Sequence, residues 1–519
     1  MTNPRLSKYF ERGVLGATLA GLAFCTVCLQ FTPALLTVDG YYHAAVTQFI
    51  RDNGWFLDRF PWTQMSVMKE AYSDKDLLLH VLALPFTFVT SDPRWVAKFA
   101  AMLLGFSFLG TLLYLFRRFL SPLPTALALV SVFLSPLFVM YYSDFRPGTL
   151  ASIFTLLGLY FAVERRKYPL FVVALLYSWA HLSAFTLVFF VVLCELIRFL
   201  RDREYDTRVV LYAIAGVVAG LVVHPNFPAN LVTIYINGFL TPLYALGGSK
   251  IAFAMELYSV TSKTAFITNS VVFTAFWAMM WAAWIYRPRI SLHTMVFGVA
   301  ANLYYLLSLL SNRFWFPAVP LAIVTAAAFA RDLSLRLDQT QPDKKRNVAR
   351  IAVVLWALMA LPLTLACVKG LEARLKYKNE FSLKYERAAV WMSKNIPPGE
   401  TIFHSSWGES PYLICLNPRG RYLVVLDPIY MYYWSKDVYE LYQDLFEGRS
   451  TMDPYKALSE VFKTRYGITS KNAGFYHLIE KDARFRPLYD DKDIVIFTLE
   501  APAPQAAAKS VKPAKRSHK

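Results

Sequence analysis

The sequence predicts a polytopic α-helical membrane protein with about eleven transmembrane helices, followed by a small α/β domain at the C-terminus. The first observation is composition: 56% of the 519 residues are hydrophobic, 17% are charged, and the mean hydropathy is +0.36. These values are typical of integral membrane proteins. The second is that apolar stretches of membrane-spanning length alternate with short basic loops as far as about residue 368. The third is that the last third of the chain loses this pattern, and polar and apolar residues are interspersed there.

The orientation of the spans follows from the distribution of Lys and Arg. Arg5, Lys8 and Arg12 precede the first apolar stretch, at about residues 14–36, which places the N-terminus in the cytoplasm. Later spans are expected at about residues 95–116 and 123–142, and the last at about 351–368. The net charge of +18 is explained by basic residues at the cytoplasmic ends of spans, so the composition argues against a nucleic-acid-binding protein.

The chain divides into three predicted parts. Residues 1–370 form the transmembrane domain, which includes a first external loop at residues 37–94. Residues 371–500 form the α/β domain, with strands expected at 401–407, 421–426 and 494–499, and helices at 380–395, 437–446, 455–466 and 475–482. An odd number of crossings places this domain outside, which is the periplasmic side of the inner membrane in a bacterium. Residues 501–519 are rich in Ala, Pro and Lys and are expected to be a disordered basic tail.

The first external loop concentrates acidic and imidazole groups at one membrane surface. Asp39 precedes a helical apolar pattern that ends at Asn53-Gly54, so it is an N-cap candidate, and His43 lies one turn further on the same face. A second in-plane helix is expected from about residue 74 to 89, with Asp74 near its start and His80 within it. This concentration of polar groups indicates a functional site.

Three short motifs carry a resemblance to a known family. They are D-G-Y-Y-H at residues 39–43, Y-S-D-K-D-L-L-L-H at residues 72–80 and S-D-F-R-P-G at residues 143–148. Together with the many spans and the external α/β domain, they resemble GT-C-type membrane glycosyltransferases, which use a polyprenyl-phosphate-linked sugar donor. The chain is distantly similar to oligosaccharyltransferase catalytic subunits and protein mannosyltransferases. The W-W-D tripeptide of oligosaccharyltransferases is absent, and its nearest counterpart is S-W-G-E at residues 406–409, which argues against protein N-glycosylation.

The resemblance implies a GT-C-like core and an inverting transfer of one sugar from a polyprenyl-phosphate carrier. The acceptor would be an envelope glycan, lipid or protein on the external face of the bilayer. Two alternatives remain open: a polytopic transporter or flippase, and a non-catalytic GT-C-like assembly partner. Transporters place polar binding groups near the bilayer midplane, whereas the acidic groups here gather at one surface, which favours the enzyme.

The resemblance and the chemistry of transfer assign roles to particular residues. Asp39 is expected to be the general base or to orient the acceptor, and Asp144 is the second catalytic carboxylate. The alternative roles are a helix cap for Asp39 and, for Asp144, an ion pair with Arg146 on a solvated loop. The leaving phosphate needs cationic or hydrogen-bonding partners. The residues expected to bind substrate are His43, Asp74, His80, Arg146 and Arg313.

Several of these assignments have structural alternatives. Asp74 also suits the start of a helix, and Arg313 suits an interfacial position where it reaches lipid headgroups. His404, Trp407 and Asp427 of the α/β domain are either acceptor contacts or ordinary residues at strand ends. The sequence establishes no cofactor, and it leaves open whether a metal is required. A divalent cation, Mg²⁺ or Mn²⁺, is an optional addition, and its ligands would be Asp39, Asp144 and His43.

Overall fold

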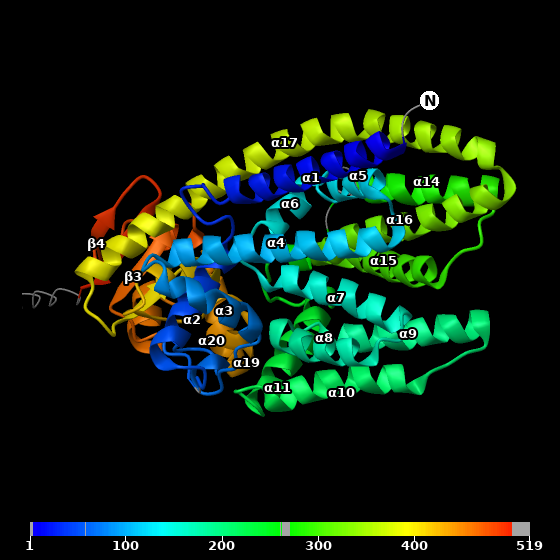
Figure 1. The fold of residues 1–519 in the computed structure, drawn as a ribbon. Coiled ribbons are helices and arrows are strands. Elements are labelled where there is room, and N and C mark those ends of the chain that lie inside the picture. The colour runs from blue at the N-terminus through cyan, green and yellow to red at the C-terminus, as the bar shows by residue number, and fades with distance from the viewer. Residues whose placement is uncertain (1–3, 58, 260, 262–269, 501–519) are drawn as a thin grey trace, which may run out of the picture.

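The computed structural model describes residues 4–57, 59–259, 261 and 270–500. The expected basic tail at 501–519 therefore lies outside the described residues. The long helices run side by side along one direction, and the sheet and the small helices gather at one end of them (Figure 1). The helices of this bundle are α1 (Pro4–Cys28), α4 (Pro93–Phe119), α5 (Pro122–Val132), α6 (Pro136–Tyr142), α7 (Pro147–Val163), α8 (Lys167–Ala180), α9 (Ala184–Asp202), α10 (Thr207–Val223), α14 (Ser270–Tyr286), α15 (Leu292–Leu310), α16 (Trp315–Thr340) and α17 (Pro342–Asn395).

Six helical segments among the described residues are long and apolar enough to cross a membrane. They are Lys8–Cys28, Pro93–Phe119, Ala229–Leu246, Leu292–Leu310, Asn312–Thr340 and Pro342–Asn395. Shorter apolar helices, such as α7 and α10, lie among them. The expected number of about eleven spans is not confirmed, because several predicted spans are shorter than a bilayer requires. The third predicted span is broken into α5 and α6, and the break comes just before Pro136, which has no N–H to continue the first helix.

Helix α17 differs most from the prediction. It continues without interruption for 54 residues, about 80 Å at 1.5 Å per residue, and reaches the C-terminal sheet (Figure 1). The predicted domain boundary between residues 370 and 371 falls inside this helix. The separate helix expected at 380–395 is its last part, and it ends at Asn395, before Pro397-Pro398. The C-terminal domain is thus joined to the bundle by a helix rather than by a flexible linker.

The first external loop folds into two helical units. They are α2 (Val38–Asn53), which ends at Gly54 with φ of 85°, and α3 (Leu77–Ala83), which continues as the turn η2 (Leu84–Phe88). A short turn, η1 (Val67–Lys69), lies between them. Asp39 is not the N-cap: Thr37 holds that position with extended backbone, and Asp39 lies in the first turn of α2. Its side chain is therefore available for tertiary contacts.

The C-terminal domain holds a five-stranded sheet in the order β2-β1-β3-β5-β4. The strands are β1 (Thr401–His404), β2 (Arg421–Tyr422), β3 (Tyr466–Ser470), β4 (Phe485–Asp490) and β5 (Ile494–Leu499). Strand β1 is parallel to β2 and β3, and β5 is antiparallel to both β3 and β4. The expected strands near 401 and 494 are present, the one near 421 is shorter, and β3 and β4 were missed. The surrounding helices are η6 (Trp407–Glu409), α18 (Ser410–Leu416), α19 (Ile429–Trp434), α20 (Lys436–Phe446), α21 (Pro454–Lys456), η7 (Ala457–Val461) and α22 (Gly474–Ile479).

The first external loop docks on this sheet. Residues 62–65 run beside β2, where the Tyr422 N–H donates to the Trp62 carbonyl at 2.6 Å and the Met65 N–H donates to the Leu423 carbonyl at 2.9 Å. The aromatic rings of Tyr41 in α2 and Tyr412 in α18 pack with centroids 4.5 Å apart. Because backbone hydrogen bonds and ring packing both cross this boundary, the loop and the domain form one layer at the end of the bundle.

A third segment, between α10 and α14, completes this layer. It contains α11 (Ala229–Thr233), the π-helical turn η3 (Ile234–Leu240), α12 (Thr241–Leu246) and η4 (Met255–Leu257). Ala252 is held from both sides by the C-terminal domain: its carbonyl accepts from Trp407 Nε1 at 3.1 Å, and its N–H donates to the Tyr439 hydroxyl at 2.9 Å. These contacts fix the residues just before Glu256, which faces the site described next.

Candidate functional site

The candidate site is centred on the guanidinium of Arg146, at the start of α7. It forms ion pairs with Asp39 Oδ2 at 2.7 Å and with Glu256 Oε2 at 2.9 Å, and lies 3.9 Å from Asp144 Oδ2. Asp39 comes from α2, Asp144 and Arg146 from the turn between α6 and α7, and Glu256 from η4. The two predicted catalytic carboxylates therefore lie around one cation, although about one hundred residues separate them in the chain. We call Asp39, Asp144, Arg146 and Glu256 the arginine centre.

Asp144 is the most enclosed carboxylate of the arginine centre, with 3% of its surface exposed. Burial raises its pKa to about 6, although Arg146 and the hydroxyl of Thr37, which donates to Asp144 Oδ2, act in the opposite direction. Gly40 allows α2 to approach this closely, because a Cβ there would lie 3.4 Å from Asp144 Oδ1 and 3.3 Å from Leu35 Cδ1. The alternative of a solvated surface pair with Arg146 is wrong, because Asp144 is buried.

Glu256 links the arginine centre to Arg313, whose Nη2 lies 2.8 Å from Glu256 Oε1. Arg313 belongs to the turn η5 (Asn312–Phe314), and 43% of its side chain is exposed. Burial alone raises the pKa of Glu256, but the two arginines outweigh it and hold that pKa well below its usual range. Sequence reasoning missed Glu256. The available signal was its isolation: no other acidic residue occurs between Asp206 and Asp332.

The two predicted histidines and Asp74 form a second, buried cluster. Asp74 Oδ2 lies 2.7 Å from His80 Nδ1, and His80 Nε2 lies 2.9 Å from His43 Nδ1. The exposed fractions are 3% for Asp74, 0% for His80 and 3% for His43. Asp74 and His80 were expected to bind substrate; in the structure they hydrogen-bond each other, and His80 also bonds His43. Burial lowers the pKa of His43, and the nearby charges of His80, Lys75 and Arg146 lower it further.

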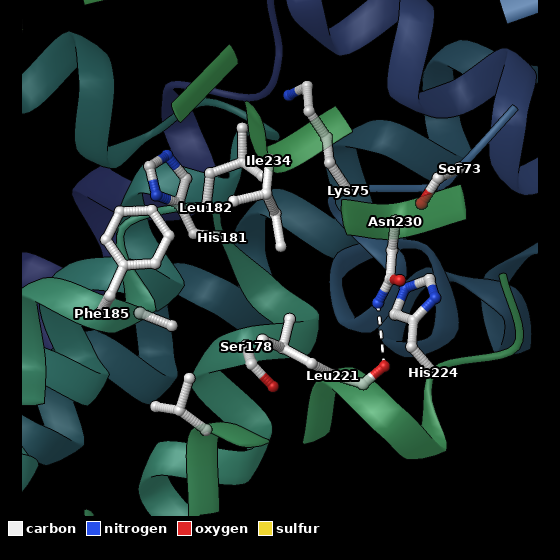
Figure 2. A pocket seen from close by; sticks show the side chains of 12 residues that line it. Ser73, Lys75, Ser178, His181, Leu182, Phe185, Leu221, His224, Asn230 and Ile234 are labelled. Atoms are coloured by element: carbon white, nitrogen blue, oxygen red, sulfur yellow. Dashed lines mark hydrogen bonds between the residues drawn. The ribbon is translucent and has the colours of Figure 1, made fainter. Parts of the chain in front are cut away.

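A small cleft lies beside this cluster, between α8, α9, α10, the segment that begins at α11 and the first external loop. Figure 2 shows Lys75, His181 and His224 around it, together with apolar side chains such as Leu221 and Ile234. Lys75 Nζ pairs with Asp76 Oδ2 at 2.6 Å. Burial lowers the pKa of His181 to about 3. Lys75 lies within the Y-S-D-K-D-L-L-L-H motif but was not among the expected substrate-binding residues, because in sequence a lysine between two aspartates looks like a solvated charge pair.

The residues expected to hold a metal do not fit that role. Asp39 Oδ2 pairs with Arg146, Asp144 Oδ2 accepts from Thr37, and His43 Nδ1 bonds His80. The guanidinium at the middle of this set repels a cation. Throughout the described part of the chain, no group of three or more His, Cys, Asp or Glu side chains is arranged to hold a metal ion.

The C-terminal domain contributes a further acidic group. Asp427 follows Leu426, a non-glycine residue at φ of 56°, a rarely populated backbone conformation often found at functional sites. Burial raises the pKa of Asp427 to about 6, while the charges of Arg313 and Lys75 oppose that increase. His404 is structural, because its Nε2 accepts from the Leu423 N–H at 3.2 Å and it is fully buried.

Comparison with solved structures identifies the fold. The oligosaccharyltransferase of Archaeoglobus fulgidus in the apo form aligns with a TM-score of 0.63 at 13% identity, covering 91% of this chain and 71% of that one. The chain has a GT-C fold. ArnT from Cupriavidus metallidurans bound to undecaprenyl phosphate gives 0.57 at 13% identity, covering 94% and 98%. The arabinofuranosyltransferase AftD from mycobacteria gives 0.52 at 13% identity, covering 93% and 40%.

The expected resemblance to GT-C glycosyltransferases is thus confirmed at the level of the fold. No protein-family model and no curated protein matches the sequence. Another structure of the archaeal oligosaccharyltransferase with this GT-C fold is a complex with Zn and sulfate, with a TM-score of 0.57 at 12% identity, covering 87% of this chain and 68% of that one.

Proposed function

We propose that this protein is a glycosyltransferase that moves a sugar from a polyprenyl-phosphate carrier to an acceptor at the external membrane surface. The observation that carries the proposal is the position of the arginine centre, which combines acidic groups for an acceptor with a cation for a phosphate. The undecaprenyl phosphate bound to ArnT supports the same class of donor, since that protein shares the fold.

The donor is proposed to place its phosphate among Arg146, Arg313 and Lys75, and its lipid tail along apolar residues of the cleft. Guanidinium groups bind phosphate oxygens in pairs, and an ammonium group adds a point charge. Val217, Leu221 and Ile234 give the cleft an apolar wall, which suits the first prenyl units. Glu256 holds both arginines in the present structure, so the phosphate has to compete with its carboxylate.

The acceptor hydroxyl is proposed to bind between Asp39 and Asp144. A carboxylate whose pKa is about 6 is mostly ionised at neutral pH, so it accepts a hydrogen bond from a polar hydrogen of the acceptor beside the attacking hydroxyl and orients that hydroxyl. We propose a single displacement that inverts the anomeric carbon, because it needs only a proton acceptor for the hydroxyl and cations for the leaving phosphate. The acceptor class remains an envelope glycan, lipid or protein, and the proposed location is the inner membrane, with the C-terminal domain in the periplasm.

The test is donor consumption by the purified protein in detergent. Synthetic polyprenyl-phosphate sugars are incubated with an acceptor extract from envelope membranes, and release of polyprenyl phosphate is followed. We expect Arg146→Gln to lower consumption by about 10²-fold or more, the scale for losing one charge-stabilising contact. Arg387→Gln is the matched control, since Arg387 is half-exposed on α17 and its carboxylate partners lie at 3.7 Å and 3.9 Å. The proposal would be rejected if Arg146→Gln consumed donor as fast as Arg387→Gln and the parent protein.

A further inference from the structure

We propose that His43, His80 and Asp74 form a proton relay, in which His43 Nε2 takes the proton of the acceptor hydroxyl during transfer. This inference rests on the proposed function and deepens it, because it names the group that receives the proton. In this relay His43 touches the substrate, whereas His80 and Asp74 are positioning residues that act through it.

The geometry of the relay is set by separate elements that converge. His43 is on α2, His80 is on α3, and Asp74 lies in the turn that precedes α3. The two links are 2.7 Å and 2.9 Å long, within the range of good hydrogen bonds. Asp74 is fixed in turn, because its N–H donates to Asn226 Oδ1 at 3.1 Å and its Oδ1 accepts from the Asp76 N–H at 3.2 Å.

The direction of the hydrogen bonds follows from which atoms are able to donate. The Asp74 pKa is lowered, because His80 and the Asp76 N–H outweigh the effect of burial, so its carboxylate only accepts. His80 Nδ1 therefore donates to Asp74. In neutral His80 the Nε2 atom then carries a lone pair, which accepts from His43 Nδ1–H. His43 Nε2 is left with its own lone pair, and no residue in the described part of the chain hydrogen-bonds it.

His43 lies beside the arginine centre. It follows Asp39 by four residues in α2, so both side chains lie on one face of the helix. The imidazole also packs against the ring of Phe145, with centroids 5.7 Å apart, and Phe145 is flanked in the chain by Asp144 and Arg146. The charge of Arg146 also acts on His43, so the proposal places the acceptor hydroxyl beside both the carboxylates and His43.

Charge explains why a relay is needed rather than a single histidine. A positive charge on His43 is opposed by burial and by Lys75 and Arg146. When His43 Nε2 gains a proton, its Nδ1 proton passes along the 2.9 Å link to His80 Nε2. The positive charge then lies on His80, in contact with the Asp74 carboxylate. The ionisable groups that face the relay are Tyr42, Tyr72, Lys75, Asp76, Arg146 and His224.

The step balances without a further reactant. The acceptor oxygen forms a bond to the anomeric carbon, and the bond between that carbon and the phosphate oxygen breaks, with its electron pair leaving on the phosphate. The acceptor proton goes to His43 Nε2, and one proton moves from His43 Nδ1 to His80 Nε2. After product departure the His80 Nε2 proton returns to His43 Nδ1 and the His43 Nε2 proton passes to water, which restores the starting state.

The first test uses variants and two readouts. We expect His43→Gln to lower kcat by about 10²-fold while the dissociation constant for polyprenyl phosphate changes less than about threefold. Asp74→Asn retains an oxygen that accepts from His80 but loses the charge. We therefore expect a lower kcat and an acid limb of the kcat–pH profile that moves to lower pH, because the protonated relay is no longer stabilised. His477→Gln, on an exposed surface histidine, is the matched control and should behave like the parent.

The outcomes separate the relay from the proposed function. A parent protein that consumes no polyprenyl-phosphate sugar overturns the proposed function, and the relay with it. An active parent whose folded His43→Gln or Asp74→Asn variant keeps the parent kcat and acid limb overturns the relay alone.

A second measurement reads the parent protein itself, and the variants serve only to assign its signals. Nitrogen-15 NMR of histidine-labelled parent at pH 8 should show both His43 and His80 protonated at Nδ1 and not at Nε2. Signals are assigned with the variants that do fold. A His43 that carries its proton at Nε2 overturns the relay, because the receiving lone pair would be absent.

Discussion

Replacing Asp144 by Asn should raise stability and lower transfer at the same time. Burial raises the pKa of Asp144 from 3.8 to about 6. At about 1.4 kcal/mol per pH unit, the ionised side chain costs the folded state about 3 kcal/mol. Asn fills the same volume without charge and still accepts a hydrogen bond from Thr37. We therefore expect Asp144→Asn to unfold later than the parent at pH 7.5, by up to about 3 kcal/mol.

The sign of the effect changes with pH in a defined way. Between about pH 4 and pH 6 the unfolded carboxyl has released its proton while the folded one still holds it, so parent stability falls as pH rises through this window. The full cost is present above pH 6 and absent near pH 4, and the advantage of Asp144→Asn follows the same course. The measurement is thermal unfolding of both proteins in detergent from pH 4 to pH 8, with donor consumption measured in parallel.

Asp482→Asn provides a control of opposite sign. The pKa of Asp482 is lowered, because Arg484 donates to it, so this substitution should destabilise the protein at neutral pH. The reasoning about Asp144 is refuted if Asp144→Asn melts below the parent at pH 7.5, or if its advantage is the same at pH 4 and pH 8. Full transfer activity in a stabilised Asp144→Asn protein would separately remove Asp144 from the proposed mechanism.

Three further predictions concern the donor, the layer at the end of the bundle, and topology. Arg313→Gln should raise the KM for donor about tenfold with little change in melting temperature, since its side chain is 43% exposed; an unchanged KM would remove it from the phosphate site. Trp407→Phe removes the hydrogen bond to the Ala252 carbonyl. It should speed hydrogen exchange in the segment around Ala252, and equal exchange would show that this contact does not fix the segment. A reporter that is active only in the periplasm should be active when it is fused after Glu500 and inactive when it is fused near Asp343. The reverse pattern would invert the proposed topology.

The sequence predicted those parts of the molecule that depend on local pattern. Apolar periodicity located most helices, Gly54 ended α2 as expected, and the strand at Ile494–Leu499 was placed correctly. Charge at one surface, together with the D-G-Y-Y-H motif, indicated where the polar groups would gather. Asp39 and Asp144 were selected from two separate loops, and the fold brings both to one guanidinium.

The rest depended on tertiary contacts that a single sequence does not contain. Glu256 lies in an apolar interval with no motif around it, and only the position of Arg146 and Arg313 gives it a role. Gly238 lies inside η3, because helix packing outweighs the weak helix propensity of one glycine. Strand β4 was missed because its exposed side chains give it no clear alternation of polar and apolar residues.

Helix α17 makes the bundle and the C-terminal domain mechanically one body. Over about 80 Å, a tilt of one degree at its N-terminal end moves its C-terminal end by about 1.4 Å. A displacement of that size equals half a hydrogen-bond length, which is enough to break contacts between the first external loop and β2. Pro362 lies within the helix and leaves one carbonyl without its partner N–H, so bending concentrates there. The alignment of the site therefore depends on how straight the lipid-exposed part of α17 is held by the bilayer around it.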